Sequence, residues 1–240
     1  MDGQKKIILP WFPGLGDSLQ HSWMPRRFKE LGFDVYLSTK ARFRNPDIKK
    51  LVWDTNPYLS GVDYDEPNCG DLGGVLQYAN HQLGFIANWQ KVHGLQKPYD
   101  KYPEIYYQPK LIDGLQNFVL VDFSCVSLWD DYVKLDMASI IPENAMVMEF
   151  SRSMNEIDSD FFCVKNGKRS YYTYDIFQYV DAIYSCKKFM CLFAGGAVLS
   201  SAIQKYKPID VECFVVDCPR TKSAEMQDLY FFDNIKYTWL

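Results

Sequence analysis

The segment from residue 5 to residue 38 constrains the fold more than any other part of the sequence. Residues 5–12 have the apolar character of a buried strand, and Pro-Gly-Leu-Gly-Asp at 13–17 is typical of a tight turn. Apolar residues then recur at helical spacing up to Gly32, and residues 33–38 form a second strand pattern. Two strands joined through a helix are expected to run parallel with a right-handed crossover.

The same alternation of strands and helices returns in the second half. Strands are predicted at 118–123, 145–150, 189–193 and 211–216, helices at 127–137, 175–186 and 195–206, and a hairpin at 160–174 that turns at Asn166-Gly167. The last stretch, 223–240, is expected to be partly helical. This alternation predicts an α/β fold with two doubly wound sheets or, as the weaker alternative, one larger sheet.

The stretch between the two halves has few periodic signals. Residues 45–66 predict a short helix followed by irregular structure, and residues 72–94 an amphipathic helix that ends at Gly94. Residues 96–117 contain three prolines and are the candidate linker. We therefore expect two compact Rossmann-like domains, at 1–112 and 113–240.

Charge and hydropathy exclude some classes of protein. The chain has 26 Lys and Arg against 30 Asp and Glu, so its formal net charge of -4 disfavours a general nucleic-acid binder, although a locally basic groove remains compatible with it. The longest strongly apolar stretch, Phe189 to Leu199, is shorter than the ~20 residues of a membrane-spanning helix. Only three apolar residues precede Pro10, which is too few for a secretory signal. We expect a cytoplasmic protein with no membrane span.

The seven cysteines are expected to be reduced core thiols, because their number is odd and several lie in apolar stretches. The pairs Cys186/Cys191 and Cys213/Cys218 have the outermost common spacing of zinc ligands, so a structural zinc site is the alternative. Plain burial is favoured, because each pair is expected to lie along one helix or strand and not in a loop, and because the three histidines are scattered along the chain. We expect no metal and no cofactor.

The first candidate site is the glycine turn after the first strand. Gly14 and Gly16 permit a close approach of the backbone, and Asp17 begins the helix. Asp17 is either the N-cap of that helix or a catalytic carboxylate that faces a substrate. His21, one helical turn later, is either directed at the same cleft or simply hydrogen-bonded on the helix face.

The second candidate site is the double-glycine turn at Gly195, Gly196 and Ala197, which opens a helix after a strand. Free backbone N–H groups at such a helix start can hold a diphosphate, although glycines there can also serve tight packing alone. Polar residues that follow two neighbouring strands are expected at the same edge of the sheet and complete this donor side: Ser124, Ser127, Ser151 and Arg152.

Three segments resemble glycosyltransferase family 9, the heptosyltransferase-like enzymes of GT-B fold. They are Gly-Leu-Gly-Asp-Ser-Leu-Gln at 14–20, Asn56-Pro57-Tyr58, and the run from Asp175 through Asp181 to Ala202. The resemblance implies an inverting, metal-independent transferase that uses a nucleotide-sugar donor and a glycan, lipid-linked or small-molecule acceptor. It makes Asp17 the general base, and it places Gly14, Gly16, Gln20 and His21 on the acceptor side and the second glycine turn on the donor side.

The late segment departs from the family pattern. Where the family has Asp-Ser/Thr-Gly followed by a histidine, this chain has Ala194, Gly195, Gly196 and Leu199, and the whole chain is shorter than usual members. Two alternatives therefore stand beside the main hypothesis: a glycosyltransferase that acts on nucleic-acid bases, and a non-catalytic binding module of GT-B fold. A Gly-x-Ser-x-Gly nucleophile elbow and a Walker-type phosphate loop are both missing from the sequence.

Overall fold

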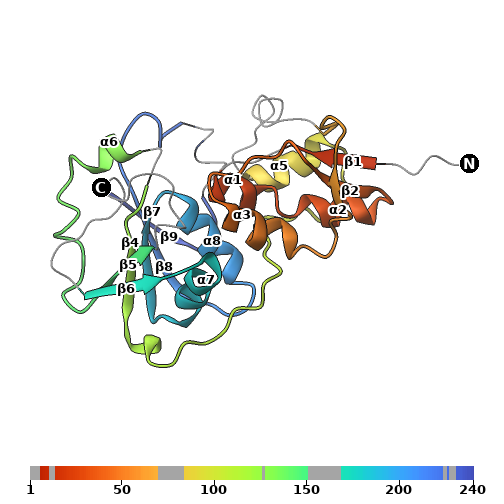
Figure 1. Cartoon of the computed structure of the whole chain (residues 1–240). Coiled ribbons are helices and arrows are strands. Elements are labelled where there is room, and N and C mark those ends of the chain that lie inside the picture. Colours follow the sequence, from red (N-terminus) through yellow and green to blue (C-terminus); the bar gives the residue numbers. More distant parts are fainter. Residues whose placement is uncertain are drawn as a thin grey trace, which may run out of the picture.

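The computed structural model describes residues 6–10, 14–69, 84–125, 128–150, 169–223, 226 and 231–240. The strands of these residues form two separate parallel sheets (Figure 1). The first sheet has the order β1-β2-β3, with β1 at Lys6–Leu9, β2 at Asp34–Ser38 and β3 at Gly61–Asp63. The parallel pairing of β1 with β2 confirms the predicted crossover unit.

Two helices, not one, connect β1 with β2. Helix α1 spans Leu15–Gln20 and helix α2 spans Met24–Glu30, so the prediction of a single continuous helix is wrong. Pro25 lies in the first turn of α2, and because proline has no N–H group and clashes with the preceding turn, the helix restarts there. Gly32 has a φ of 82° and ends the unit as predicted.

The chain between β2 and the second sheet is more regular than its sequence suggests. Helix α3 (Pro46–Lys49) is capped by the Asn45 side chain and runs into a π-helical turn, η1 (Lys50–Asp54), and then into β3, which was not predicted. Helix α5 spans Gly84–Val92, and the chain leaves it through Gly94, whose φ is 70°. Residues 70–83, which include most of the predicted first half of this helix, lie outside the described residues.

The second sheet has six parallel strands in the order β6-β5-β4-β7-β8-β9. Their bounds are Val119–Asp122 (β4), Met146–Phe150 (β5), Arg169–Thr173 (β6), Lys188–Leu192 (β7), Asp210–Val215 (β8) and Lys236–Trp239 (β9). Strand β6 covers the last part of the predicted hairpin and pairs parallel with β5. The predicted turn at Asn166-Gly167 falls within residues 151–168, which lie outside the described residues. Of the tail that was predicted to be partly helical, residues 236–239 form strand β9.

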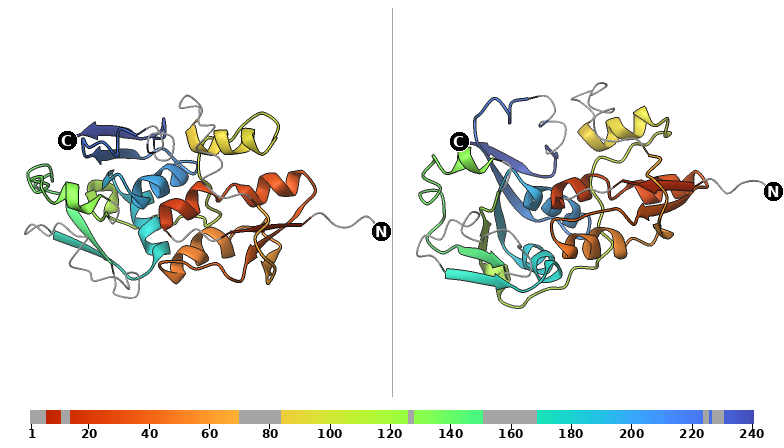
Figure 2. Two further views of the ribbon diagram at one scale, coloured as in Figure 1. Left: turned by 90° about the horizontal axis from the view of Figure 1, so that it is seen from above. Right: turned by 45° about the horizontal axis from the view of Figure 1, so that its top comes forward.

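Helices α7 (Ile176–Ser185) and α8 (Gly195–Ile203) lie on the side of the second sheet that faces the first sheet (Figure 2). Helix α7 begins at Asp175, whose side chain accepts a hydrogen bond of 2.8 Å from the Gln178 N–H, as expected for an N-cap. A short helix α6 (Trp129–Tyr132) and a 3-10 turn η2 (Leu115–Asn117) complete the helical elements of the described chain. The observed fold is the predicted α/β class with two parallel sheets.

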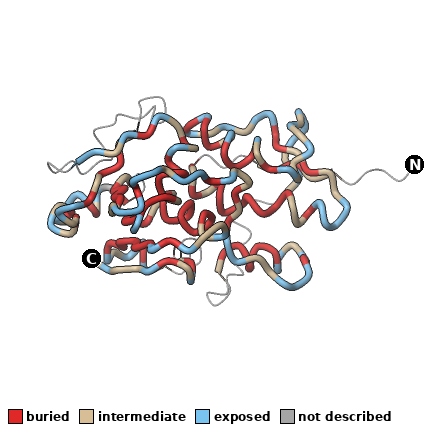
Figure 3. Tube along the Cα trace, turned by 90° about the horizontal axis from the view of Figure 1, so that it is seen from below, coloured by how far each residue is buried: buried red, intermediate tan, exposed pale blue. Residues whose placement is uncertain are grey.

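Buried residues run continuously through both sheets and the helices between them (Figure 3). The six described cysteines are free thiols, and four of them, at 125, 186, 191 and 213, are buried. Burial is therefore observed for Cys186, Cys191 and Cys213 of the two predicted pairs, whereas Cys218 is only half-buried. No helix of that part is long and apolar enough to cross a bilayer.

The segment 104–112 crosses from one sheet to the other and is hydrogen-bonded on both sides. The Glu104 N–H donates to the Ser22 hydroxyl beside the first sheet (2.6 Å), and Arg26 forms an ion pair of 2.7 Å with the Glu104 carboxylate. Toward the second sheet, the Tyr107 hydroxyl and the Lys110 N–H donate to Asp181 of α7, at 2.9 and 2.8 Å. This crossing segment is anchored along its length.

Candidate active site

The two predicted glycine turns meet directly. A Cβ atom on Gly195, in the first turn of α8, would lie 3.1 Å from the backbone nitrogen of Gly16 and 3.2 Å from the Cβ of Leu15, both in the first turn of α1. Such distances are shorter than ordinary van der Waals contact, so a side chain at position 195 would force the neighbouring atoms of α1 to shift by a few tenths of an ångström. The two helix starts, one beside each sheet, therefore share one location.

Asp17 is not the N-cap of α1. The N-cap is Gly14, which has an extended backbone, and Asp17 follows in the first helical turn. Its carboxylate folds back over Gly14, because a Cβ on Gly14 would lie 2.6 Å from Asp17 Oδ2. Asp17 is half-buried, and within the described chain its carboxylate forms no hydrogen bond or ion pair. A carboxylate in this state is free to accept a proton from a bound hydroxyl.

His21 occupies a packing position between α1 and α5. It is 1% exposed, and its ring meets Phe85 and Trp89 edge-on at centroid distances of 5.3 and 6.2 Å. His21 Nδ1 lies 2.8 Å from the backbone oxygen of Asp17, and because a carbonyl can only accept, Nδ1 carries the proton. Burial lowers the pKa of His21 to about 4, so the ring is neutral at pH 7. In this arrangement the imidazole holds the end of α1 and is shielded from solvent.

Gln20 is buried as well, with 1% of its surface exposed. Among the residues that the structure describes, neither of its two side-chain amide atoms has a hydrogen-bond partner, which is an unusual state for a buried polar group. The sequence places Gln20 one turn after Gly16 and Asp17, on the same face of α1. The amide is thus next to the shared turns but enclosed by protein.

The start of α8 has no side-chain cap. Its N-cap is Ala194, in an extended conformation, and an alanine cannot accept from the first N–H groups of the helix. Gly195 is half-buried, whereas Gly196 and Ala197 are buried. The α8 start therefore offers backbone N–H donors beside the turn that carries Asp17.

Asp122, which the sequence interpretation passed over, lies under the α8 turn. This carboxylate is the last residue of β4 and is 5% exposed. It accepts hydrogen bonds from the Tyr179 hydroxyl (2.5 Å), the Ser124 hydroxyl (2.5 Å) and the Ser124 N–H (3.0 Å). A Cβ on Gly196 would lie 3.3 Å from Asp122 Oδ2 and 2.8 Å from the Tyr179 oxygen. Burial raises the pKa of both Asp122 and Tyr179.

One signal pointed to Asp122: it is an acidic residue at the end of an apolar strand and two positions before Ser124, which was predicted. Tyr179 had no signal, because a tyrosine in an amphipathic helix is ordinarily a core residue. The remaining predicted donor-side residues, Ser127, Ser151 and Arg152, lie outside the described residues.

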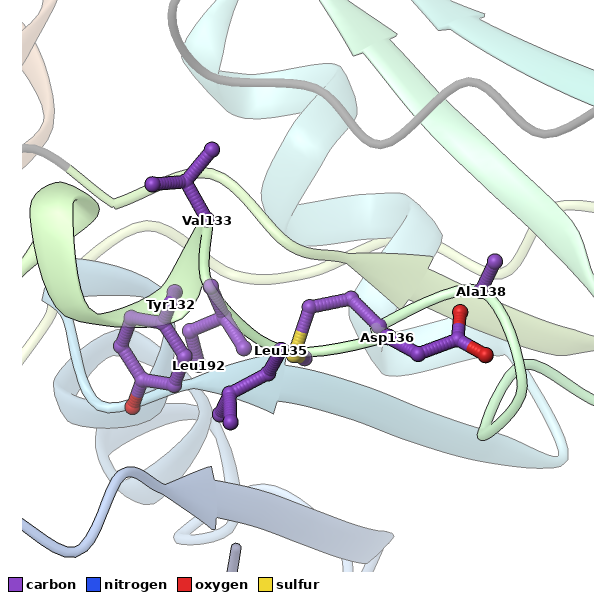
Figure 4. Close-up of a pocket in the computed structure, with 7 residues that line it drawn as sticks. Tyr132, Val133, Leu135, Asp136, Ala138 and Leu192 are labelled. Carbon is purple, nitrogen blue, oxygen red and sulfur yellow. The ribbon is translucent and has the colours of Figure 1, made fainter.

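A separate cavity of about 180 Å³ lies beside Leu192, the last residue of β7 (Figure 4). Its other lining residues belong to the stretch after the start of α6, and most of them are apolar: Tyr132, Val133, Leu135, Asp136, Met137 and Ala138. The Tyr132 hydroxyl donates to the Phe214 carbonyl at 2.6 Å and is therefore occupied. None of the predicted site residues lines this cavity.

The described residues contain no group of three or more His, Cys, Asp and Glu side chains that could hold a metal ion.

Comparison with known proteins gives a structural likeness without a sequence match. No family model matches the sequence, and no curated protein matches it. Among solved structures, the iron-containing dodecameric glycosyltransferase TibC from enterotoxigenic E. coli H10407 superposes with a TM-score of 0.57 at 15% identity, over 89% of this chain and 59% of that one. A glycosyl transferase family 9 protein from Veillonella parvula superposes over 100% of this chain and 87% of that one, with a TM-score of 0.53 at 8% identity.

The chain has the fold of these glycosyltransferases. A second TibC structure, a heptosyltransferase in complex with ADP-D-beta-D-heptose, gives a TM-score of 0.52 at 14% identity over 90% of this chain. The chain spans about 60% of the length of the two TibC structures. The GT-B fold that the resemblance implied is confirmed, and the iron of TibC has no corresponding group of ligands among the residues described here.

Proposed function

We propose that this chain is an inverting, metal-independent glycosyltransferase of the cytoplasm, which moves a sugar from a nucleotide-sugar to a hydroxyl of a glycan, lipid-linked or small-molecule acceptor. The single observation that supports it most is the contact between Gly16 and Gly195. It joins a turn whose carboxylate has no hydrogen bond or ion pair within the described part of the chain to a helix start that has no side-chain cap. The fold shared with TibC and the Veillonella protein supports the same reaction class.

The proposed division of labour follows from the charges that the reaction develops. The N–H groups at Gly195 and Gly196 bind the donor diphosphate and stabilise the negative charge that grows on it as it leaves. Asp17 accepts the proton of the acceptor hydroxyl while the hydroxyl oxygen attacks the anomeric carbon. The bond from that carbon to the diphosphate oxygen breaks on the opposite face, so the configuration inverts.

In the same proposal, residues 1–112 form the acceptor-side domain and residues 113–240 the donor-side domain. Gly14 and Gly16 shape the acceptor side around Asp17, and Ser124 lies on the donor side. Gln20 and His21 contribute through packing, because both are buried.

The test replaces Asp17 by Asn and measures turnover with a panel of ADP-, UDP- and GDP-sugars that includes ADP-heptose. Loss of a general base is expected to lower kcat by about 10²- to 10⁴-fold and to leave nucleotide affinity unchanged. Asp130→Asn is the matched control, because Asp130 is also an aspartate in a first helical turn, that of α6, but its side chain is exposed. Parent-like turnover in Asp17→Asn would refute the assignment of the base.

A non-catalytic binding module is the second candidate, and one observation favours it. Ala194 and Leu199 stand at positions where family 9 carries polar donor contacts, and Leu199 is fully buried. Thermal shifts with nucleoside diphosphates and their sugars separate the two functions, since a ligand at ~100 times its Kd adds ~2.7 kcal/mol to stability. If no nucleotide raises the Tm, the module is favoured over the enzyme.

A further inference from the structure

The Ser124 side chain lies beside the donor site of the proposed function, on which this inference rests. Ser124 follows β4 directly and is half-buried, so part of it faces solvent. Both of its hydrogen-bond donors reach the same atom: the N–H and the hydroxyl lie 3.0 and 2.5 Å from Asp122 Oδ1.

The number of protons in this cluster limits what Ser124 can offer to a ligand. An ionised carboxylate only accepts, so the one hydroxyl proton of Ser124 is directed at Asp122. The serine oxygen keeps lone pairs that remain able to accept. Tyr179 likewise donates its proton to Asp122 Oδ2, so the carboxylate is fully used within the protein.

The hydrogen-bonded group of Ser124, Asp122 and Tyr179 lies beside the proposed diphosphate site at the start of α8. Asp122 Oδ2 lies 3.3 Å from the place of a Cβ on Gly196, and Oδ1 of the same carboxylate holds Ser124. The Asp122 carboxyl group therefore lies between the serine oxygen and the first turn of α8 and contacts both of them. Donor N–H groups and an acceptor oxygen are next to each other at this edge of the second sheet.

We propose that Ser124 is a specificity-determining residue that accepts a hydrogen bond from a hydroxyl group of the nucleotide-sugar, and that Asp122 is the positioning residue that makes it an acceptor. Phosphate oxygens have no proton to donate at neutral pH and are held by the α8 N–H groups. A hydroxyl of the ribose or of the transferred sugar has such a proton and lies only a few bonds from the phosphates.

The experiment compares ligands with and without hydroxyl groups. Affinities of inorganic pyrophosphate, the tightest-binding of ADP, UDP and GDP, and the corresponding nucleotide-sugar are measured by titration calorimetry, with pyrophosphate in displacement of the nucleotide. In Ser124→Ala the affinity of the nucleotide-sugar is expected to fall about 5- to 15-fold, as for a lost hydrogen bond, and that of pyrophosphate to stay within about twofold. Ser124→Thr, which keeps the hydroxyl, is expected to restore binding.

The pattern of losses identifies the hydroxyl. An equal loss for the nucleoside diphosphate and its sugar assigns the ribose, and a loss confined to the nucleotide-sugar assigns the transferred sugar. A loss for pyrophosphate as large as that for the nucleotide-sugar, or no loss for either ligand, would overturn the proposal. A parent protein that binds none of the three ligands would refute the proposed function itself, and this inference with it.

The positioning role of Asp122 is tested by a double-mutant cycle on affinity, which a purely structural role would not couple. Asp122→Asn keeps the shape but weakens the hold on the serine proton, so nucleotide-sugar affinity is expected to fall in the parent background. In the Ser124→Ala background the same change is expected to have no further effect, because the oriented oxygen is gone. Additive losses would show that Asp122 does not act through Ser124.

Discussion

Gly195 and Gly16 approach so closely that a single Cβ atom on Gly195 would stand 3.1 Å from the Gly16 backbone nitrogen. Gly195→Ala is therefore expected to push α8 away from α1, to lower the free energy of unfolding by about 1–3 kcal/mol as for an overpacked core, and to lower kcat by misplacing Asp17. Urea unfolding and steady-state kinetics measure the two effects. Gly196→Ala is a second overpacking variant for comparison: its Cβ would lie 2.8 Å from the Tyr179 hydroxyl oxygen and 3.3 Å from the Asp122 carboxylate, so it disturbs the second sheet's side of α8 and not the contact with α1. Equal stability and activity of Gly195→Ala and the parent would contradict a functional contact.

Ala194 gives the start of α8 no side-chain cap. A serine at that position is expected to raise the stability of the protein and to lower its affinity for nucleotides. Ala194→Ser adds a side-chain acceptor for the first N–H groups, which is worth about 0.5–1 kcal/mol of stability. The same bond competes with the donor diphosphate, so nucleotide affinity is expected to fall about 3- to 10-fold. Asp175→Ala removes the cap of α7 and serves as the contrast, with lower stability and unchanged affinity. An Ala194→Ser protein that binds nucleotides as tightly as the parent would show that these N–H groups are not used.

The buried His21 is expected to make the protein sensitive to mild acid. Its pKa falls from 6.5 in the unfolded chain to about 4 in the folded one, so the unfolded state binds the proton more readily between these values. The stability that depends on the neutral ring is fully present above pH 6.5 and is lost as pH falls toward 4, by about 2–3 kcal/mol.

His21→Phe keeps an aromatic ring beside Phe85 and Trp89 but does not titrate. It is expected to cost about 1 kcal/mol at pH 7, from the lost hydrogen bond to the Asp17 carbonyl, and to flatten the pH dependence between 6.5 and 4. Urea unfolding at a series of pH values measures both quantities. Parallel curves for parent and variant would show that His21 does not carry the acid sensitivity.

Asp181 of α7 holds the crossing segment 104–112 together with Ser185, whose hydroxyl accepts a hydrogen bond of 2.7 Å from the Ile112 N–H. Asp181→Ala removes the partner of both the Tyr107 hydroxyl and the Lys110 N–H, and it is expected to destabilise the protein by about 2–4 kcal/mol. Asp181→Asn keeps one acceptor oxygen and is expected to cost less. Asp210→Ala, an exposed aspartate at the start of β8, is the control. A cost of Asp181→Ala no greater than that of the control would mean that the segment is held by its other contacts.

The sequence was informative where a strand is a continuous apolar run. Strands β1, β4 and β7 were predictable for this reason, since strands buried on both faces of a parallel sheet lack alternation. Strands β2, β5 and β8 were predicted as well, although each contains an acidic residue: Asp34, Glu149 and Glu212. Strand β3 has three residues with little burial, and β9 is an edge strand with mixed polarity, so neither gives a periodic signal. The break between α1 and α2 was missed because helical spacing of apolar residues continues across it, although Pro25 marked the place.

The candidate site also has features that the sequence predicted and features that it did not. Both glycine turns were predicted from local sequence, because tight turns and open helix starts depend on a few neighbouring residues. Their contact through Gly16 and Gly195 joins residues far apart in the chain, and no local pattern encodes such a distance. The burial of His21 was equally out of reach, because it is α5, remote in sequence, that covers the ring.

The backbone oxygen of Ile105 is bonded by the side chains of both Lys205 and Tyr206, which follow α8. Any chimaera that exchanges one half of this chain for that of another glycosyltransferase would sever these bonds unless the exchanged piece brings its own connecting peptide. The crossing segment 104–112 thus forms hydrogen bonds that are specific to both halves of this chain, and recombination points for engineering belong outside it.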